Sequence, residues 1–452
     1  MTRKLTPALA TVLVLTIGYG AMLAVNLPGH LSFDSIVQLH EGRLHVRDTW
    51  APAIYGAVLG AFDRLLPGTA LYVAASGLLF FGSLASLILL RPKTSWAAVL
   101  VALALVCSPL VLIYQGIVWK DVLFANFAVA GCICLAHAAK AWPRLMLRWA
   151  WLAAALALLG LAGLVRQNGL LVAVTAALAL GWTARGRGWR MALVWGLGGL
   201  AAVVAVSHVL SVAVEPTPTS AAEATTKGVR ILRRYDVVAA VARDPHVKLE
   251  AMTRANAAAT AVIRADAAKF YTAQRVDTLG IDSSVGQALR EIEPKAIEAD
   301  WRAIVTERPD LYIHDRLGIF HWLLAPPELE RCLPVFIGVD GPADKLAALK
   351  IAPRRSPADE ALHRYAKFFY PTPLYSHLTY GALALLTALG LLIRRDPADI
   401  PIAALMLGAV GFAASFLVIS LACDFRYLYL LDLAGMTGLF YLALDPRLRR
   451  RG

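Results

Sequence analysis

Charged residues are scarce in this chain, and their scarcity narrows the possible classes of protein. Asp, Glu, Lys and Arg make up 17% of the 452 residues, whereas a typical soluble chain has about 25%. Hydrophobic residues make up 58%. The hydrophobic content excludes an intrinsically disordered chain and argues against an ordinary soluble protein. The composition therefore predicts a polytopic, all-α membrane protein.

Cysteine is also rare, and its placement argues against both a disulfide framework and a zinc site. Four of the five cysteines fall in or at the end of apolar runs, where Cys acts as a small hydrophobe: Cys107, Cys132, Cys134 and Cys423. Only Cys332 lies in a polar region, and no zinc-ligand spacing occurs. We expect no disulfide framework and no cofactor, while a divalent metal stays open.

The apolar runs predict ten transmembrane helices, because each needs about 20 mostly apolar residues. The first run is longer than a signal-peptide core and has no cleavage site after it, so we interpret it as an anchor. The predicted spans lie near 7–27, 69–90, 97–115, 117–138, 149–165, 168–184, 191–214, 376–393, 401–422 and 427–444.

The short apolar segment 51–66 is ambiguous, and the distribution of basic residues decides how to interpret it. If it does not cross the membrane, one set of span ends carries sixteen basic residues: Arg3, Lys4, Arg91, Lys93, Lys140, Arg144, Arg148, Arg185, Arg187, Arg190, Arg394, Arg395, Arg447, Arg449, Arg450 and Arg451. The opposite set carries six: Arg43, Arg47, Arg64, Lys120, Arg166 and Arg426. The positive-inside rule makes the first set cytoplasmic. We therefore predict cytoplasmic termini in the inner membrane and a re-entrant or interfacial helix at 51–66 on the outer face.

A 161-residue insert separates the seventh and eighth spans, which divides the chain into 1–214, 215–375 and 376–452. It holds 22 basic and 21 acidic residues, so the net charge of +13 comes mostly from the membrane part and does not indicate a nucleic-acid partner. We predict a mainly helical, extracytoplasmic domain with helices at 248–275 and 287–308, the latter stopped by Pro309. A short strand is expected at 334–339.

Polar residues at the predicted outer ends of the spans are candidates for a functional site, because ionisable groups near membrane depth are costly. Asp34 follows the first span and could act as a general base, or Ser32 or Asp34 could instead cap a short helix at 35–41. Lys120 and Asp121 begin the fourth span. Lys120 could bind a phosphate, or the two residues could instead only snorkel to the interface and cap the helix.

Two further groups lie on the same predicted face. Arg166, Gln167 and Asn168 separate two spans and fit either phosphate recognition or a tight turn. Asp424, Arg426 and Tyr427 precede the last span and could form a plain Asp–Arg pair; within that span, Asp432 needs a polar partner.

The stretches SFDSIVQL (32–39), VWKDVLF (118–124), RQNGL (166–170) and FRYLYL (425–430) resemble motifs of the GT-C superfamily of integral membrane glycosyltransferases. The branch with protein O-mannosyltransferases and aminoarabinose transferases is the most similar. A His-Pro-Pro-like motif of many members is replaced here by the sequence DTWAPA (48–53).

The resemblance implies a sugar transfer from a polyprenyl-phosphate donor to a hydroxyl of a glycan, lipid or protein acceptor. It implies that Asp34 is the base and that Lys120, Arg166 and Arg426 bind the donor phosphate, supported by Asp121, Gln167, Asn168, Asp424 and Tyr427. Inversion is expected from a single displacement. A lipid-linked oligosaccharide ligase and a non-enzymatic transporter or lipid flippase stay open as alternatives.

Overall fold

The computed structural model describes residues 5–47, 49, 52–214, 218–394 and 396–447. Several basic residues of the charge count lie outside these ranges: Arg3, Lys4, Arg395, Arg449, Arg450 and Arg451. Part of the DTWAPA segment also lies outside them. The described residues form helices and no named strand, which confirms the all-α prediction.

The chain divides into two compact units, which we describe separately. The first unit comprises residues 1–217, 335–413 and 428–452, and the second comprises 218–334 and 414–427. The predicted insert extended to residue 375, whereas the second unit leaves residues 335–375 with the first. The physical reason is that Leu31 and Val339 form a parallel bridge, and Val339 also pairs with Arg354.

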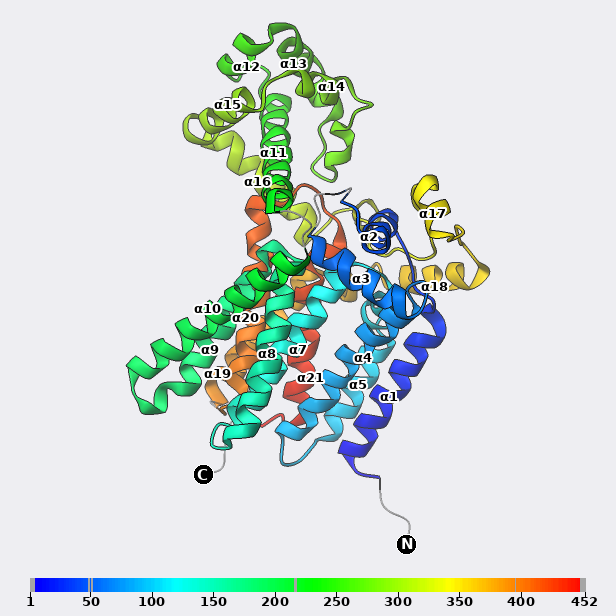
Figure 1. Ribbon diagram of the computed structural model, residues 1–452, viewed down its shortest axis with the longest axis vertical. Helices are drawn as coiled ribbons and strands as arrows, with labels where there is room; N and C mark the ends of the chain where they lie inside the picture. Colours follow the sequence, from blue (N-terminus) through cyan, green and yellow to red (C-terminus); the bar gives the residue numbers. More distant parts are fainter. Residues whose placement is uncertain (1–4, 48, 50–51, 215–217, 395, 448–452) are drawn as a thin grey trace. The chain divides into compact units, whose positions relative to one another are not determined.

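The first unit contains the long apolar helices (Figure 1). Its N-terminal elements are α1 (Pro7–Asn26), α2 (Phe33–Leu44), α3 (Ala53–Leu65), α4 (Ala70–Ser86), η1 (Leu87–Leu90), α5 (Trp96–Cys107), α6 (Pro109–Leu112), η2 (Tyr114–Gly116), α7 (Lys120–Lys140), α8 (Leu145–Val165), η3 (Gln167–Gly169), α9 (Leu170–Ala184), η4 (Arg185–Arg187) and α10 (Trp189–Val214). Its later elements are α17 (Ala343–Leu349), α18 (Pro357–Phe368), η7 (Pro373–Tyr375), α19 (His377–Arg394), most of α20 (Asp399–Ile419) and α21 (Tyr429–Leu444).

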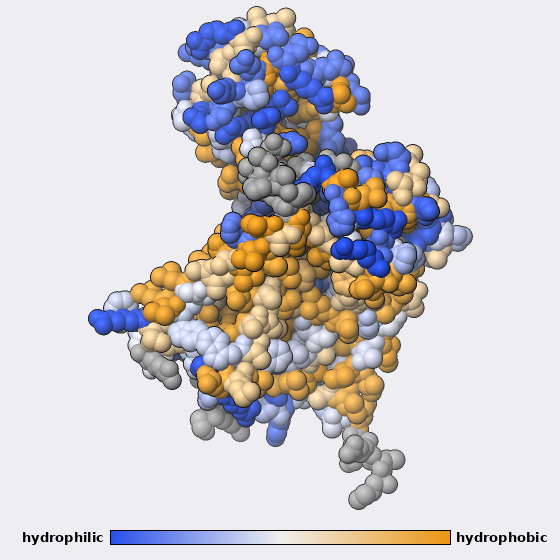
Figure 2. Space-filling view, in the orientation of Figure 1, coloured by the Kyte–Doolittle hydropathy of each residue, from blue (hydrophilic) through white to orange (hydrophobic). Residues whose placement is uncertain are grey.

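Nine helical stretches of the described residues are long and apolar enough to cross a membrane. The one other predicted span, near 97–115, is present as two pieces, Trp96–Cys107 and Pro109–Gly116, bent by 65°. Ser108 and Pro109 stand at the bend, where a proline begins the second piece. Apolar residues cover much of the visible surface of this unit, as expected for a protein in a lipid bilayer (Figure 2).

Within the predicted segment 51–66, residues Ala53–Leu65 form α3, a helix of 13 residues that is too short to be a span. It packs on α2, and the two helices approach closely at glycines. A Cβ on Gly42 would lie 1.9 Å from the carbonyl oxygen of Gly56, so only glycine fits there. The α2–α3 pair is thus a compact hairpin between the first two spans, consistent with a segment that does not cross.

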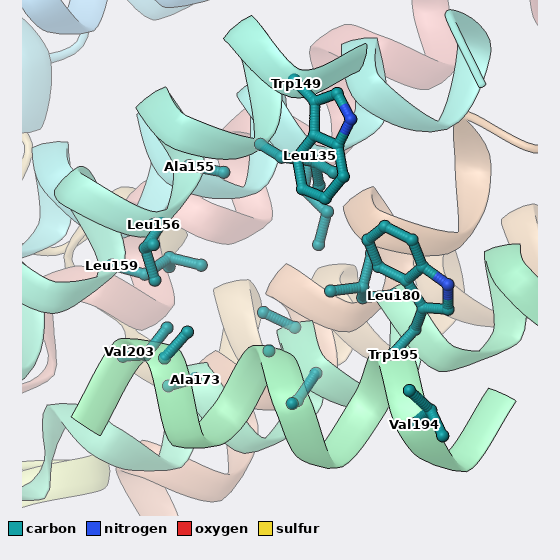
Figure 3. Close-up of a pocket in the computed structure, with 16 residues that line it drawn as sticks. Leu135, Trp149, Ala155, Leu156, Leu159, Ala173, Leu180, Val194, Trp195 and Val203 are labelled. Carbon is teal, nitrogen blue, oxygen red and sulfur yellow. The ribbon is translucent and has the colours of Figure 1, made fainter. Parts of the chain in front are cut away.

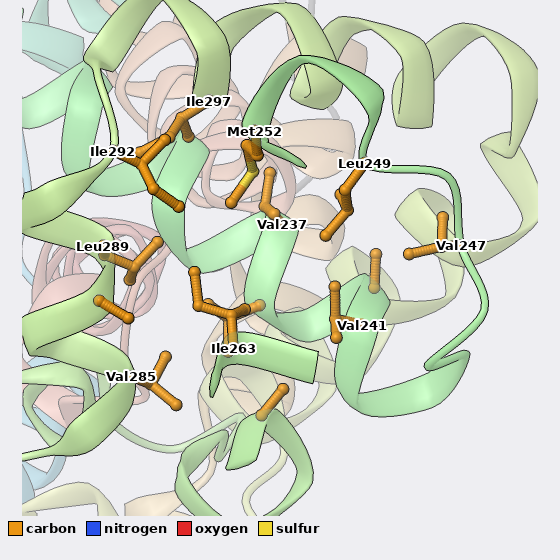
Figure 4. Packing of buried hydrophobic residues seen from close by; sticks show 14 of the residues in the cluster. Val237, Val241, Val247, Leu249, Met252, Ile263, Val285, Leu289, Ile292 and Ile297 are labelled. Atoms are coloured by element: carbon orange, nitrogen blue, oxygen red, sulfur yellow. The ribbon is translucent and has the colours of Figure 1, made fainter. Parts of the chain in front are cut away.

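The second unit is a small helical domain with its own hydrophobic core (Figure 4). Its elements are α11 (Pro218–Arg243), α12 (Glu250–Ala255), α13 (Ala257–Phe270), η5 (Val276–Leu279), α14 (Ser284–Glu291), α15 (Pro294–Glu307), α16 (Pro309–Leu324), η6 (Leu329–Cys332), the end of α20 and most of η8 (Phe425–Leu428). Val237, Ile263, Leu289 and Ile297 come from four of these helices and are all buried in the core. This core supports the prediction of a mainly helical insert.

Three details of the insert differ from the sequence predictions. The helix expected at 248–275 is interrupted at Asn256, whose side chain caps α13 by accepting from Ala259 N at 3.0 Å. The helix expected at 287–308 is likewise two helices, α14 and α15, and Pro309 ends it by starting α16 at its first position. The prediction of a strand at 334–339 is wrong, because this segment forms only isolated bridges, both at Val339.

The expectation of no disulfide framework missed one disulfide, since Cys332 and Cys423 are bonded to each other within the second unit. Their separation of 91 residues hid the pairing. Cys423 follows an apolar run in the sequence, but it lies beyond the end of α20 and its backbone N–H donates to Gln274 O at 3.0 Å. The bond therefore ties the segment after α20 to the rest of this unit.

Candidate functional site

Asp34 lies in the first turn of α2 and is half-buried. Ser32 is the N-cap of this helix, as the capping alternative predicted, but the helix spans Phe33–Leu44 rather than 35–41. Ser35 Oγ accepts from the backbone N–H of Ser32 at 3.2 Å and donates to Val118 O at 2.6 Å. These bonds fix the start of α2, with Asp34, on the segment that leads into α7.

The start of α7 lies beside the start of α2. The Trp119 indole N–H donates to Ser32 Oγ at 2.9 Å, and the backbone N–H of Val118 donates to His30 O at 3.0 Å. Lys120 is the first residue of α7 and is half-buried. Two helix N-termini, each the positive end of a helix dipole, therefore meet next to Lys120, an arrangement that favours an anion.

The structure brings together two of the predicted residues, Asp121 and Arg166, as an ion pair. Asp121 is in the first turn of α7 and is 2% exposed, while the Arg166 side chain is 11% exposed at the end of α8. The Arg166 Nε and Nη2 groups both face Asp121 Oδ1. A carboxylate held this way fixes the plane of the guanidinium, which orients its donors. Gln167 and Asn168, in η3, are exposed and half-buried respectively.

A buried polar cluster adjoins the start of α7. Tyr114 packs edge-on against Trp119, with ring centroids 5.7 Å apart, and stacks on Tyr429 at 4.8 Å. Gln115 and Asn126 exchange two hydrogen bonds, of 3.0 and 2.8 Å, and Gln115 Nε2 also donates to Tyr429 OH at 3.1 Å. Since buried polar groups need partners, this network fixes η2, α7 and α21 against one another.

Asp432 has the polar partner that the sequence required, and that partner is His377. The Asp432 carboxylate lies 2.7 Å from His377 Nδ1, and both side chains are fully buried. The sequence analysis did not single out His377, Gln115 or Asn126. The predicted topology contained a signal for His377, because it begins the span at 376–393 at the same end as Asp432.

His30 joins this end of the first unit to residues 335–359. Its Nδ1 accepts from Gly338 N at 3.1 Å, and its Nε2 lies 2.9 Å from Asn26 Oδ1. Burial, reinforced by the Arg354 charge and opposed by Asp359, lowers the pKa of His30 to about 4. His30 is therefore neutral at pH 7, with the proton on Nε2 donated to Asn26.

Arg426, Asp424 and Tyr427 belong to the second unit. Arg426 is buried and its Nη2 donates to Asp424 Oδ2 at 3.1 Å, while its guanidinium carbon is 5.8 Å from the Tyr427 ring centroid. The structure therefore supports the plain pairing of Asp424 with Arg426. The phosphate-binding role of Arg426 stays a prediction.

Among the described residues, no group of three or more His, Cys, Asp or Glu side chains could hold a metal ion. No protein-family model, no curated protein and no solved structure matches this chain.

Proposed function

We propose that this protein is a membrane glycosyltransferase that moves a sugar from a polyprenyl-phosphate donor to an acceptor hydroxyl, with inversion. One observation supports it most: the starts of α2 and α7 meet, bringing the helix ends that carry Asp34, Lys120 and the Asp121–Arg166 pair to one end of a lipid-embedded helix bundle. We call this the Asp34 end, defined by Asp34, Lys120, Asp121 and Arg166. It combines a carboxylate base with groups that favour a phosphate.

The donor phosphate is the leaving group in this reaction, and cations stabilise it as the glycosidic bond breaks. Lys120 supplies a point charge, and Arg166 supplies directed donors whose orientation Asp121 fixes. The N-terminal dipoles of α2 and α7 add to the positive potential. The polyprenyl chain stays in the bilayer among the apolar helices.

Asp34 acts as general base on the acceptor. It takes the proton from the acceptor hydroxyl as that oxygen bonds to the anomeric carbon and the bond to the phosphate oxygen breaks. The electron pair of the broken bond goes to the phosphate. A single displacement of this kind inverts the anomeric centre. The acceptor is a glycan, lipid or protein at the extracytoplasmic face of the inner membrane.

The test is sugar transfer in membranes supplied with radiolabelled polyprenyl-phosphate sugars. We expect wild type to label an acceptor and Asp34→Asn to lose transfer at least about 10²-fold while inserting normally. Asp344→Asn is the matched control, because Asp344 is also an aspartate in the first turn of a short helix, α17, and should keep full activity. Transfer by Asp34→Asn at the wild-type rate would contradict the role of Asp34.

A second candidate, a lipid flippase or transporter, is favoured by a different observation. The span near 97–115 is broken into two pieces, Trp96–Cys107 and Pro109–Gly116, and broken spans are typical of transporters. Reconstituted liposomes with a fluorescent polyprenyl-phosphate lipid separate the two functions. Flipping without transfer would favour the transporter, and transfer only from diphosphate-linked glycans would favour an oligosaccharide ligase.

A further inference from the structure

A cavity of about 370 Å³ lies within the first unit, between α7, α8, α9 and α10 (Figure 3). The residues that line it are Leu, Val, Ala, Gly and Trp, so its walls are mostly apolar. Trp149 and Trp195 stand at one end, and Leu159 and Val203 stand at the other (Figure 3). A pocket of this size and lining in a membrane-spanning region fits a hydrocarbon chain.

The cavity extends through about one leaflet of a bilayer. Trp149 and Leu159 are ten residues apart on α8, which corresponds to about 15 Å along a helix, half of a hydrocarbon core of about 30 Å. Its surroundings are accessible to lipid, because Trp149 and Val194 line it and are 51% and 63% exposed. A single lipid chain can therefore enter from the side.

A cation lies against the tryptophan end of the cavity. The Arg148 guanidinium carbon is 5.5 Å from the Trp149 ring and 5.7 Å from the Trp195 ring, and it is 5.0 Å from Trp142. Arg148 Nη1 donates to Trp142 O at 3.2 Å, and its Nε is buried without a hydrogen-bond partner. Among the described acidic residues, none forms an ion pair with Arg148. This end therefore complements an anionic headgroup.

We propose that the cavity binds an anionic diacyl phospholipid, with one acyl chain between α8 and α10 and its phosphate at Arg148. The site goes beyond the proposed sugar transfer, since Arg148 and Arg166 stand at opposite ends of α8, 18 residues or about 27 Å apart. The depth of one leaflet suits an acyl chain better than a much longer polyprenyl chain. Tryptophans and an arginine at the interface suit a phospholipid headgroup.

Native mass spectrometry of the full-length protein, titrated with phosphatidylglycerol or phosphatidylcholine, tests the headgroup. We expect wild type to retain one phosphatidylglycerol, and Arg148→Gln to weaken its binding about tenfold, the effect of losing one charge-assisted hydrogen bond. Arg185→Gln is the matched control. Arg185 also stacks on a tryptophan, Trp182, at 3.6 Å, but Trp182 does not line the cavity, so binding should not change.

The chain site is tested with two neighbouring alanines. Ala202 lines the cavity, whereas Ala201 is exposed and does not. Ala202→Phe should fill the cavity and abolish retention, and Ala201→Phe should keep it. Three results would overturn the proposal: equal retention of phosphatidylcholine, retention unaffected by both Arg148→Gln and Ala202→Phe, or displacement of phosphatidylglycerol by equimolar polyprenyl phosphate. Size-exclusion profiles identify a misfolded variant. If either Arg148→Gln or Ala202→Phe misfolds, the result for the other one decides the test.

Discussion

A buried aspartate lies at each end of the α19–α21 pair, and the two aspartates differ in their partners. Asp432 of α21 pairs with His377 of α19, and Asp399, the first residue of α20, contacts the other ends of both helices. At one end, Asp399 accepts from Arg394 Nε at 2.6 Å and from Tyr441 OH at 2.9 Å, and it also pairs with Arg91. The side chains of Arg91, Arg394 and Asp399 are 3%, 4% and 0% exposed. We call this cluster, Arg91, Arg394, Asp399 and Tyr441, the Arg394 end.

The opposite end of α21 carries Asp432, and Tyr429 there stacks on Tyr114, next to the start of α7 and so to the Asp34 end. The charged groups of the Asp34 end include two half-buried side chains, Asp34 and Lys120, which lie at the starts of two helices. At the Arg394 end, by contrast, the charged side chains are buried, and two arginines, Arg91 and Arg394, pair with the Asp399 carboxylate. The same residue types thus serve structure at one end, and are placed where a ligand could meet them at the other.

The largest effect is expected at the Arg394 end. Asp399→Ala leaves two buried arginines without their common partner, which should cost about 3–5 kcal/mol of stability. Purified Asp399→Ala should lose its monodisperse peak on size-exclusion chromatography after mild heating. Asp445→Asn, which removes a carboxylate near the same cluster but keeps the backbone oxygen that accepts from Arg394, should change little. A wild-type elution profile for heated Asp399→Ala would show that the Asp399 cluster does not stabilise the protein.

Much of this contrast was accessible from the sequence, and the missing part has a physical reason. Hydropathy and basic residues predicted the spans and the non-crossing segment at α3, because both depend on local composition. They also placed Asp121 and Arg166 at one face. The Asp121–Arg166, His377–Asp432 and Cys332–Cys423 pairs depend on packing between segments distant in sequence, which periodicity does not encode.

A change of pH sharpens the comparison, because the Asp34 end is anchored by a neutral histidine. The pKa of His30 is about 4 in the folded protein and about 6.5 when unfolded, so the unfolded chain binds the proton first as the pH falls. The contribution of neutral His30 to the free energy of unfolding is therefore complete above pH 6.5. It decreases by about 3 kcal/mol as the pH falls from 6.5 towards 4. The melting temperature of wild type should fall over this window, whereas His30→Gln should give a flatter profile. Parallel profiles would contradict the burial of a neutral His30.

An Arg-to-Lys exchange at each end tests whether the two ends divide structure from chemistry. Arg166→Lys keeps the charge beside Asp121 but loses the planar guanidinium, so the rate of sugar transfer should fall about 10²-fold with little change in melting temperature. Arg394→Lys should lower the melting temperature and leave the rate per folded molecule unchanged. Loss of activity in Arg394→Lys as great as in Arg166→Lys would show that the ends are not separate in function.

The smallest effect should come from an exposed pair close to the Asp399 cluster. Arg447 donates to Asp445 at 2.8 Å, but its side chain is 67% exposed, so water screens the pair and solvates Arg447 when it is unpaired. Arg447→Ala should therefore leave the melting temperature and the transfer rate unchanged. Both substitutions change the charge at the same end of the bundle, since Arg447→Ala removes a cation and Asp399→Ala removes an anion. A large shift from Arg447→Ala would mean that the total charge at this end, rather than burial of the Asp399 cluster, stabilises the bundle.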